Sequence, residues 1–219
     1  MSLDIKICGL KTEAALEAAL AGGASHVGFI FFARSPRWVE PAEAARLRAL
    51  ATGKAKAVAV TVDADDVFLD TIVGSMKPDI LQLHGKESPE RVAEVKARYG
   101  LPVVKAFPVR TPSDLEAMRP YRGIADRIMF DAKPPAGSEL PGGNGVAFDW
   151  RILAMLDRDV DYLLSGGLNA SNVGEALRLA NPPAIDVSSG VESAPGVKDP
   201  ALIAEFFRAI RTAQKSRAA

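Results

Sequence analysis

Hydrophobic and polar positions along this chain follow two periods that alternate with each other. Short runs of β-branched and small apolar residues give way to longer Ala-rich stretches with apolar residues every three or four positions, and this pair of patterns occurs eight times. The short runs predict strands over residues 4–8, 26–31, 56–62, 79–83, 103–107, 126–131, 160–164 and 184–188. The longer stretches predict helices over residues 12–22, 41–52, 65–75, 89–98, 112–119, 148–156, 169–179 and 199–214.

The starts of several predicted helices carry local signals. Three of them have a short polar residue where an N-cap is expected, able to accept a hydrogen bond from the first unpaired N–H groups. These residues are Thr12, Ser88 and Asn169. Proline, whose missing N–H costs nothing in the first turn, stands at or near three first helical positions. These prolines are Pro41, Pro89 and Pro112.

The order of the elements predicts the fold. The strand patterns are nearly continuous apolar runs, as in residues 57–62, which suits strands buried on both faces of a parallel sheet. Alternating strands and helices imply right-handed crossovers between parallel strands. A doubly wound open sheet is the alternative, but eight units without an antiparallel edge favour closure. We therefore predict a single (β/α)8 TIM barrel that forms one catalytic domain over residues 1–219.

Composition narrows the functions open to such a barrel. The 27 basic and 27 acidic residues leave a net charge of zero, which removes the electrostatic footprint of a nucleic-acid partner. No apolar run approaches the ~20 residues of a membrane span, and no secretory signal opens the chain, so we expect no membrane partner. One cysteine excludes an internal disulfide, and two histidines argue against structural zinc. The expectation is a cytoplasmic protein without a metal site.

Polar residues end several predicted strands, on the side where barrels of this type carry their chemistry. The first strand ends at Cys8, which shares a face with Lys6 because side chains alternate along a strand. The fourth places Gln82 and His84 toward the lumen, and the sixth ends at Asp131. Each has a structural alternative: an inert buried thiol, a satisfied core histidine and a carboxylate that caps a loop.

The eighth strand places Asp186 and Ser188 on one face. Asp186 is a candidate for ligand binding, and its alternative is an ion pair with a lumenal lysine, either Lys6 or Lys105. The coincidence of polar residues at four strand ends favours a site over four separate structural roles.

Two Gly-rich turns follow the seventh and eighth predicted strands, where such barrels usually bind phosphate. Glycine lets the backbone approach a ligand closely, and successive N–H groups form an anion nest. The turns supply the candidate phosphate-binding residues Gly166, Gly167, Ser188, Ser189 and Gly190. Tight packing of the turns is the alternative explanation.

Arg37, just beyond the second predicted strand, is a candidate for binding a carboxylate through two parallel hydrogen bonds. Arg34 is the alternative donor, and a solvated surface arginine is the structural alternative. The irregular stretch 132–147 follows the sixth strand and predicts a lid, a binding loop or disorder. Within it, residues 142–145 form either a hinge or an extension of the anion pocket.

Several segments together resemble the phosphoribosylanthranilate isomerase family of tryptophan biosynthesis, from the first strand through the eighth. They are KICGL at 6–10, SPR at 35–37, LQLHG at 81–85, FD at 130–131, GGNG at 142–145, LSGGL at 164–168 and DVSSGVE at 186–192. Asn144 departs from the family, which often has Ser or Thr there, and leaves the hydrogen bonding of the loop open.

The resemblance implies an Amadori rearrangement of N-(5-phosphoribosyl)anthranilate, with Cys8 as general base, Asp131 as general acid and no cofactor. Arg37 would hold the carboxylate of this small phosphorylated substrate, and Gln82 and His84 would line the pocket. We predict that Lys6 lowers the Cys8 pKa by about 1–2 units, unless an aspartate neutralises it. Desolvation under the bound aromatic ring would keep Asp131 protonated.

Other functions stay open at this point. A ribulose-phosphate-type epimerase would be expected to show several metal-binding His and Asp at strand ends, and an indole-glycerol-phosphate synthase a catalytic Lys/Glu set. A non-catalytic phosphate-binding barrel would need neither Cys8 nor Asp131. No long exposed apolar stripe is evident, so a monomer is predicted, with a homodimer as the alternative.

Overall fold

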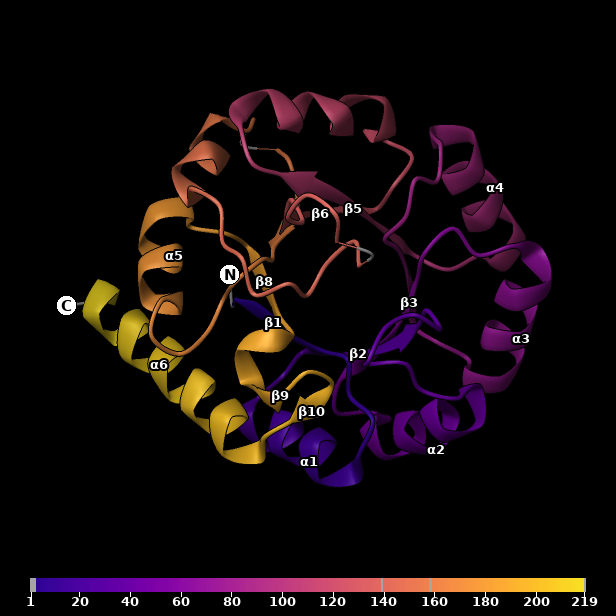
Figure 1. Ribbon diagram of the computed structural model, residues 1–219, viewed down its shortest axis with the longest axis horizontal. Helices are drawn as coiled ribbons and strands as arrows, with labels where there is room; N and C mark the ends of the chain where they lie inside the picture. Colours follow the sequence, from indigo (N-terminus) through magenta and orange to yellow (C-terminus); the bar gives the residue numbers. More distant parts are fainter. Residues whose placement is uncertain (1–2, 139, 158, 219) are drawn as a thin grey trace.

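Eight parallel strands close into a barrel in the computed structural model, which describes residues 3–138, 140–157 and 159–218 (Figure 1). Each strand pairs with the next along the chain, and β8 pairs with β1 to close the ring. The strands are β1 (Asp4–Cys8), β2 (His26–Phe31), β3 (Lys56–Thr61), β4 (Ile80–Leu83), β5 (Val103–Val109), β6 (Arg127–Ala132), β7 (Tyr162–Leu164) and β8 (Ala184–Val187). The predicted TIM barrel is confirmed, and the open-sheet alternative is wrong.

Helices form a ring around the barrel (Figure 1). The α-helices are α1 (Glu13–Gly22), α2 (Pro41–Ala51), α3 (Asp66–Met76), α4 (Pro89–Tyr99), α5 (Val173–Ala180) and α6 (Pro200–Ala218). The helices predicted over 112–119 and 148–156 are 3-10 helices, η1 (Pro112–Tyr121) and η2 (Trp150–Met155). Pro120, which has no N–H to donate, stands one residue before the end of η1.

Two of the three predicted N-caps are confirmed. Thr12 and Ser88 each accept a hydrogen bond from the backbone N–H three residues later. The prediction for Asn169 is wrong, because α5 begins later, at Val173, after Asn172. Asn169 instead caps the turn before the helix, where its side-chain oxygen accepts the N–H of residue 171 at 2.9 Å.

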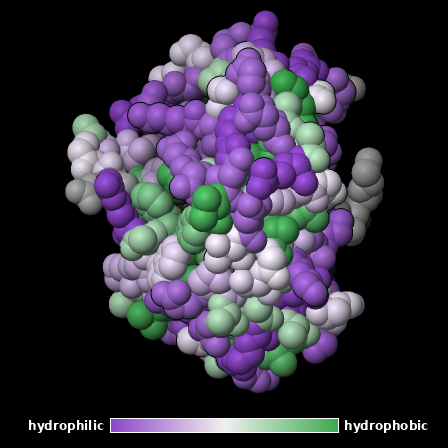
Figure 2. All heavy atoms as spheres, turned by 90° about the vertical axis from the view of Figure 1, so that its right-hand side faces the viewer, coloured by the Kyte–Doolittle hydropathy of each residue, from purple (hydrophilic) through white to green (hydrophobic). Residues whose placement is uncertain are grey.

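One side of the helix ring, formed by α3 and α4, is largely polar (Figure 2). Figure 2 shows the side occupied by α3 and α4, where hydrophilic residues predominate and hydrophobic ones are scattered. Ion pairs join these two helices, among them Asp66 with Arg91 and Asp70 with Arg98, each at 2.6 Å. The last helix, predicted over 199–214, continues to Ala218, and residue 219 lies outside the described range. No helix in the described ranges is long and apolar enough to cross a membrane.

The strands are buried on both faces, as predicted. One face packs against the helices, and the other fills the lumen with a separate apolar cluster that includes Cys8, Val60, Val104 and Met129. Lys105 alternates with Val104 along β5, so it faces the helix layer, and its prediction as a lumenal lysine is wrong. Its ammonium lies 3.1 Å from the carboxylate of Glu87.

A short antiparallel hairpin, absent from the predicted elements, follows the eighth strand. After the 3-10 turn η3 (Ser189–Val191), strands β9 (Glu192–Ala194) and β10 (Val197–Lys198) pair, with Lys198 opposite Glu192. Gly196 between them has a φ of +79° and packs so tightly against Pro36 that a side chain there would clash with the Pro36 carbonyl. The hairpin therefore seats against the segment that carries Arg37.

Candidate active site

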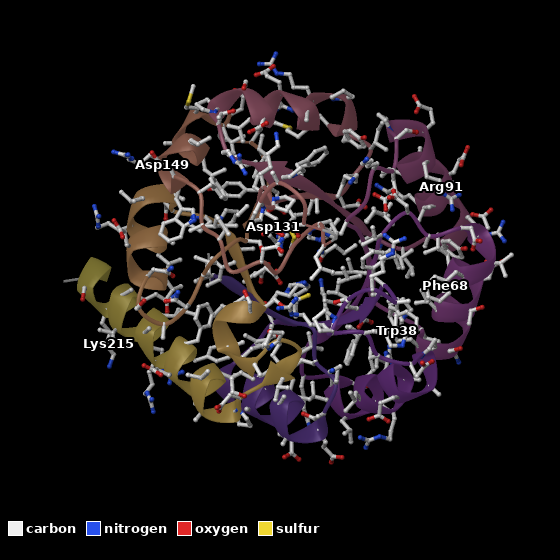
Figure 3. The ribbon with its side chains drawn as sticks, in the orientation of Figure 1. Trp38, Phe68, Arg91, Asp131, Asp149 and Lys215 are labelled. Atoms are coloured by element: carbon white, nitrogen blue, oxygen red, sulfur yellow. The ribbon has the colours of Figure 1, made fainter. Side chains whose placement is uncertain are left out.

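A cavity of about 770 Å³, counting the space at its open mouth, lies at the C-terminal ends of the strands. Figure 3 shows Asp131 near the centre of the ring, whereas Arg91, Asp149 and Lys215 lie on its rim. All but one of the predicted site residues line the cavity: Cys8, Arg37, Gln82, His84, Asp131, Gly166, Gly167, Asp186, Ser188 and Ser189. Gly190 is not among the lining residues, and a side chain there would clash with the Leu168 carbonyl, so this position has no room for a larger residue.

Cys8 lies buried in the lumen beside a charged pair. A Cβ atom added to Gly28 would lie 2.9 Å from the Cys8 sulfur and 3.1 Å from Lys6 Nζ, so both groups occupy the space that this glycine leaves open. Lys6 Nζ pairs with Asp186 Oδ1 at 2.7 Å, which confirms the ion-pair alternative for Asp186. Asp186 Oδ2 also accepts the Ser165 hydroxyl at 3.0 Å.

The predicted lowering of the Cys8 pKa is wrong in this structure. Burial raises the pKa of the Cys8 thiol, and the charge of Lys6, which acts to lower it, does not compensate. The Asp186 carboxylate, which pairs with Lys6, adds to the effect of burial because its charge also acts to raise the pKa of Cys8. For Lys6 itself, burial acts to lower the pKa, but Asp186 holds that pKa above its ordinary value.

Gln82, His84 and Asp131 form a chain of contacts across the cavity floor. Gln82 Nε2 lies 3.0 Å from His84 Nδ1, and His84 Nε2 lies 3.3 Å from Asp131 Oδ2. If Gln82 donates to Nδ1, the imidazole carries its hydrogen on Nε2, facing the carboxylate. Gln82 Oε1 is buried and has no hydrogen-bond partner among the described residues.

Arg37 is buried, so its surface alternative is wrong, and Arg34 is exposed and does not line the cavity. The Nε and Nη2 atoms of Arg37 donate to the two carboxylate oxygens of Glu192 at 2.7 and 2.8 Å. Nη2 also donates to the Gly143 carbonyl at 3.2 Å, which leaves Nη1 outside these bonds. Glu192 is 155 positions away in the sequence, and no local pattern in the chain pointed to this pairing.

The two Gly-rich turns pack against their neighbours so closely that larger residues would not fit. Gly166 and Gly167 have φ values of +90° and +64°, and Cβ atoms there would lie 2.5 Å from the Ala132 nitrogen and 2.6 Å from the Ala147 nitrogen. In the adjacent turn, the Ser188 hydroxyl donates to the Cys8 carbonyl at 3.2 Å. The turns thus line one wall of the cavity beside β1, the strand that carries Cys8.

The loop after β6 covers the cavity. Gly142 packs against Asp131 and His84, where a Cβ atom would clash with Asp131 Oδ2, and Gly143 packs against Arg37. Asn144 hydrogen-bonds within the loop: its side chain donates to the Leu140 carbonyl at 3.2 Å and accepts from Ser138 at 2.9 Å. Of the alternatives predicted for residues 132–147, these contacts favour a binding loop or lid; residue 139 lies outside the described residues.

Comparisons with known proteins agree with one another. The family model described as N-(5'phosphoribosyl)anthranilate (PRA) isomerase matches residues 5–209. A protein of Mesorhizobium japonicum named N-(5'-phosphoribosyl)anthranilate isomerase is 75% identical over 219 residues, covering 100% of both chains. The phosphoribosyl anthranilate isomerase of Thermotoga maritima superposes with a TM-score of 0.86 at 33% identity, covering 96% of this chain and 100% of that one.

A second solved structure shows a ligand in a protein of this kind. It is a phosphoribosyl anthranilate isomerase in complex with reduced 1-(o-carboxyphenylamino)-1-deoxyribulose 5-phosphate. Its TM-score is 0.83 at 31% identity, and the match covers 96% of this chain and 100% of the other.

Proposed function

The chain belongs to the N-(5'-phosphoribosyl)anthranilate isomerase family of tryptophan biosynthesis, and from this premise we propose that Cys8 and Asp131 carry out its Amadori rearrangement. The substrate is N-(5-phosphoribosyl)anthranilate, and the product is 1-(2-carboxyphenylamino)-1-deoxyribulose 5-phosphate. The observation that carries the proposal is a single cavity lined by a thiol, a carboxyl group, a buried guanidinium and two Gly-rich turns.

Asp131 acts first, as the general acid. It donates a proton to the ring oxygen of the furanose as the C1–O bond breaks and the nitrogen lone pair forms a C1=N iminium bond. The Cys8 thiolate then removes the proton from C2, the C–H electron pair forms C1=C2, and the iminium electrons return to nitrogen. The resulting enolamine becomes the ketone as its hydroxyl proton is lost and C1 gains a proton.

The thiolate is a minor species near neutral pH, because burial raises the pKa of Cys8. The positive charges of Lys6 and Lys198 act against burial and favour the thiolate. A thiolate is strongly reactive even at a low population, so a small fraction of it supports turnover.

The two ends of the substrate are both anionic, and the cavity offers a donor for each. Arg37 binds the anthranilate carboxylate, and backbone N–H groups of the turns at residues 166–167 and 188–190 bind the phosphate. Gln82 and His84 line the space between the ends. We predict that the protein acts on this substrate as a monomer, and a homodimer is the alternative.

The test is turnover of freshly made phosphoribosylanthranilate, followed by loss of its fluorescence, for the wild type beside Cys8→Ser and Asp131→Asn. We expect rapid turnover by the wild type and near-complete loss in both variants, with binding of the reduced product analogue retained. An inactive, folded wild type would refute the proposed reaction and favour another phosphate-binding barrel. Full activity in either variant would refute the role of that residue.

A further inference from the structure

Arg37 is paired with a carboxylate before any substrate arrives. The side chains of Arg37 and Glu192 are only 5% and 4% exposed, and two short hydrogen bonds join them. A bidentate pair of this kind is electrically neutral. A neutral pair has little attraction for a second carboxylate, so the pair alone does not explain how Arg37 would bind the anthranilate group.

A third buried charge changes this balance. Lys198 contacts Glu192 Oε1, and its side chain is 2% exposed. Two cations share one carboxylate, so the Arg37–Glu192–Lys198 cluster carries a net charge of +1. Lys198 does not line the cavity, which places the excess charge behind Arg37 and leaves Arg37 to present it.

The same lysine also contacts the turn that carries Ser188. Lys198 Nζ donates to the Ser188 carbonyl at 3.1 Å and lies 3.3 Å from the Ser188 hydroxyl. The Ser188 turn is one of the two proposed to bind phosphate. A chain of contacts therefore runs from Arg37 through Glu192 and Lys198 to Ser188 and joins the two segments proposed to bind anions.

We propose that Lys198 is a positioning residue for substrate binding: acting through Glu192, it supplies the net positive charge with which Arg37 binds a carboxylate. The inference rests on the proposed function, because it takes the ligand of Arg37 to be the carboxylate of the substrate. An anion that binds Arg37 neutralises the cluster, so part of the cost of burying its excess charge is recovered on binding.

The local fold and the protonation tendencies support this role. Lys198 and Glu192 lie opposite each other in the β9–β10 hairpin, and Gly196 seats the hairpin on the Pro36 carbonyl. Burial acts to raise the pKa of Glu192, but the bond from Arg37 and the charge of Lys198 hold it below its ordinary value, so Glu192 stays ionised. Burial lowers the pKa of Lys198, although the charge and the hydrogen bond of Glu192 act to raise it.

The experiment measures the Kd of two probes by calorimetry. One probe is the reduced product analogue, and the other is its counterpart made from aniline, which keeps the phosphate and lacks the carboxylate. The variants are Lys198→Met, which leaves the cluster neutral, and Glu192→Gln with Lys198→Met, which restores a net charge of +1. The matched control is Lys11→Met, because Lys11 is a half-buried lysine that does not line the cavity and donates to the same Pro36 carbonyl at 2.8 Å.

We expect Lys198→Met to raise the Kd of the carboxylate probe about 10- to 100-fold and the Kd of the aniline probe less than about 3-fold. The double variant should recover most of the lost affinity, and Lys11→Met should bind both probes as the wild type does. With substrate, Lys198→Met should raise KM and change kcat little. Should Lys198→Met not fold, Lys198→Gln removes the charge and keeps a donor for Ser188.

An equal loss of affinity for both probes would overturn the inference, as would a double variant that binds the carboxylate probe more weakly than Lys198→Met. Wild-type turnover separates this result from the proposed function. A wild type that turns over substrate, together with a Lys198 variant that does not discriminate between the probes, refutes only the role of Lys198. A wild type without turnover refutes the proposed reaction, while the two Kd values still test the charge cluster.

Discussion

Gly143 and Gly145 offer a matched pair of substitutions in the loop that covers the site. Their φ values, +73° and +70°, are nearly the same, so alanine at either position meets a similar backbone cost of about 1–2 kcal/mol. Their surroundings differ. A Cβ atom at Gly143 would lie 2.5 Å from Arg37 Nη1, whereas at Gly145 the nearest atom is Ser189 Oγ at 3.9 Å.

Gly143→Ala is therefore expected to displace the Arg37 guanidinium or the loop, and Gly145→Ala is not. Glu192 holds Nε and Nη2, so the displaced edge is the one that carries Nη1, which we propose binds the carboxylate of the substrate. Losing one charge-assisted hydrogen bond costs about 1.5–3 kcal/mol. At 1.4 kcal/mol for each tenfold change, KM should rise about 10- to 150-fold.

Steady-state kinetics of both variants beside the wild type measure this difference. We expect Gly143→Ala to raise KM with a modest change in kcat, and Gly145→Ala to stay within about 5-fold of the wild type, as its strain falls mainly on the loop. Equal effects in the two variants would show that backbone strain, and not the contact with Arg37, governs the loop. A fall in kcat with unchanged KM would refute the binding role of this edge of Arg37.

Three further predictions follow from buried titratable groups. Alkylation of Cys8 by iodoacetamide should accelerate with a midpoint above pH 8.5, because burial raises its pKa; a lower midpoint would contradict this. Burial lowers the pKa of His26 to about 4, so on acidification the unfolded chain takes up the His26 proton first. Between pH 6.5 and 4, the free energy of unfolding in urea should therefore fall by about 2–3 kcal/mol more in the wild type than in His26→Gln; equal losses would contradict this. Lys6→Met should cost about 3–5 kcal/mol by leaving Asp186 unpaired, and Lys6→Met with Asp186→Leu should recover most of that loss in the same unfolding assay.

The barrel could be predicted from the sequence because its signals are local. Strand and helix periods, proline at first turns and the N-caps Thr12 and Ser88 each depend on a few neighbouring residues. Where a local signal was ambiguous, the prediction failed. Asn169 is a suitable cap by type, but the following residues form a turn, and the helix starts at Val173.

The sequence could predict which residues line the site, but it could not predict their ion pairs and pKa shifts. Alternation along a strand placed Cys8, Gln82 and Asp131 in the lumen, and all three line the cavity. The same rule could not show that Lys105 faces the helices, because both faces of a buried strand look alike in composition. The partner of Arg37 and the direction of the Cys8 pKa depend on contacts between distant segments, which no local pattern encodes.

Charge balance distinguishes the ion pairs that support the fold from those that we assign to binding. In the described part of the chain, two isolated pairs have both side chains under a tenth exposed, Lys6 with Asp186 and Lys105 with Glu87, and each pair is neutral. The cluster around Glu192 is as deeply buried but carries one excess cation. Burying such a charge without compensation is costly, so a fold that keeps it gains most if an anion completes the cluster, which is what a carboxylate on Arg37 would do.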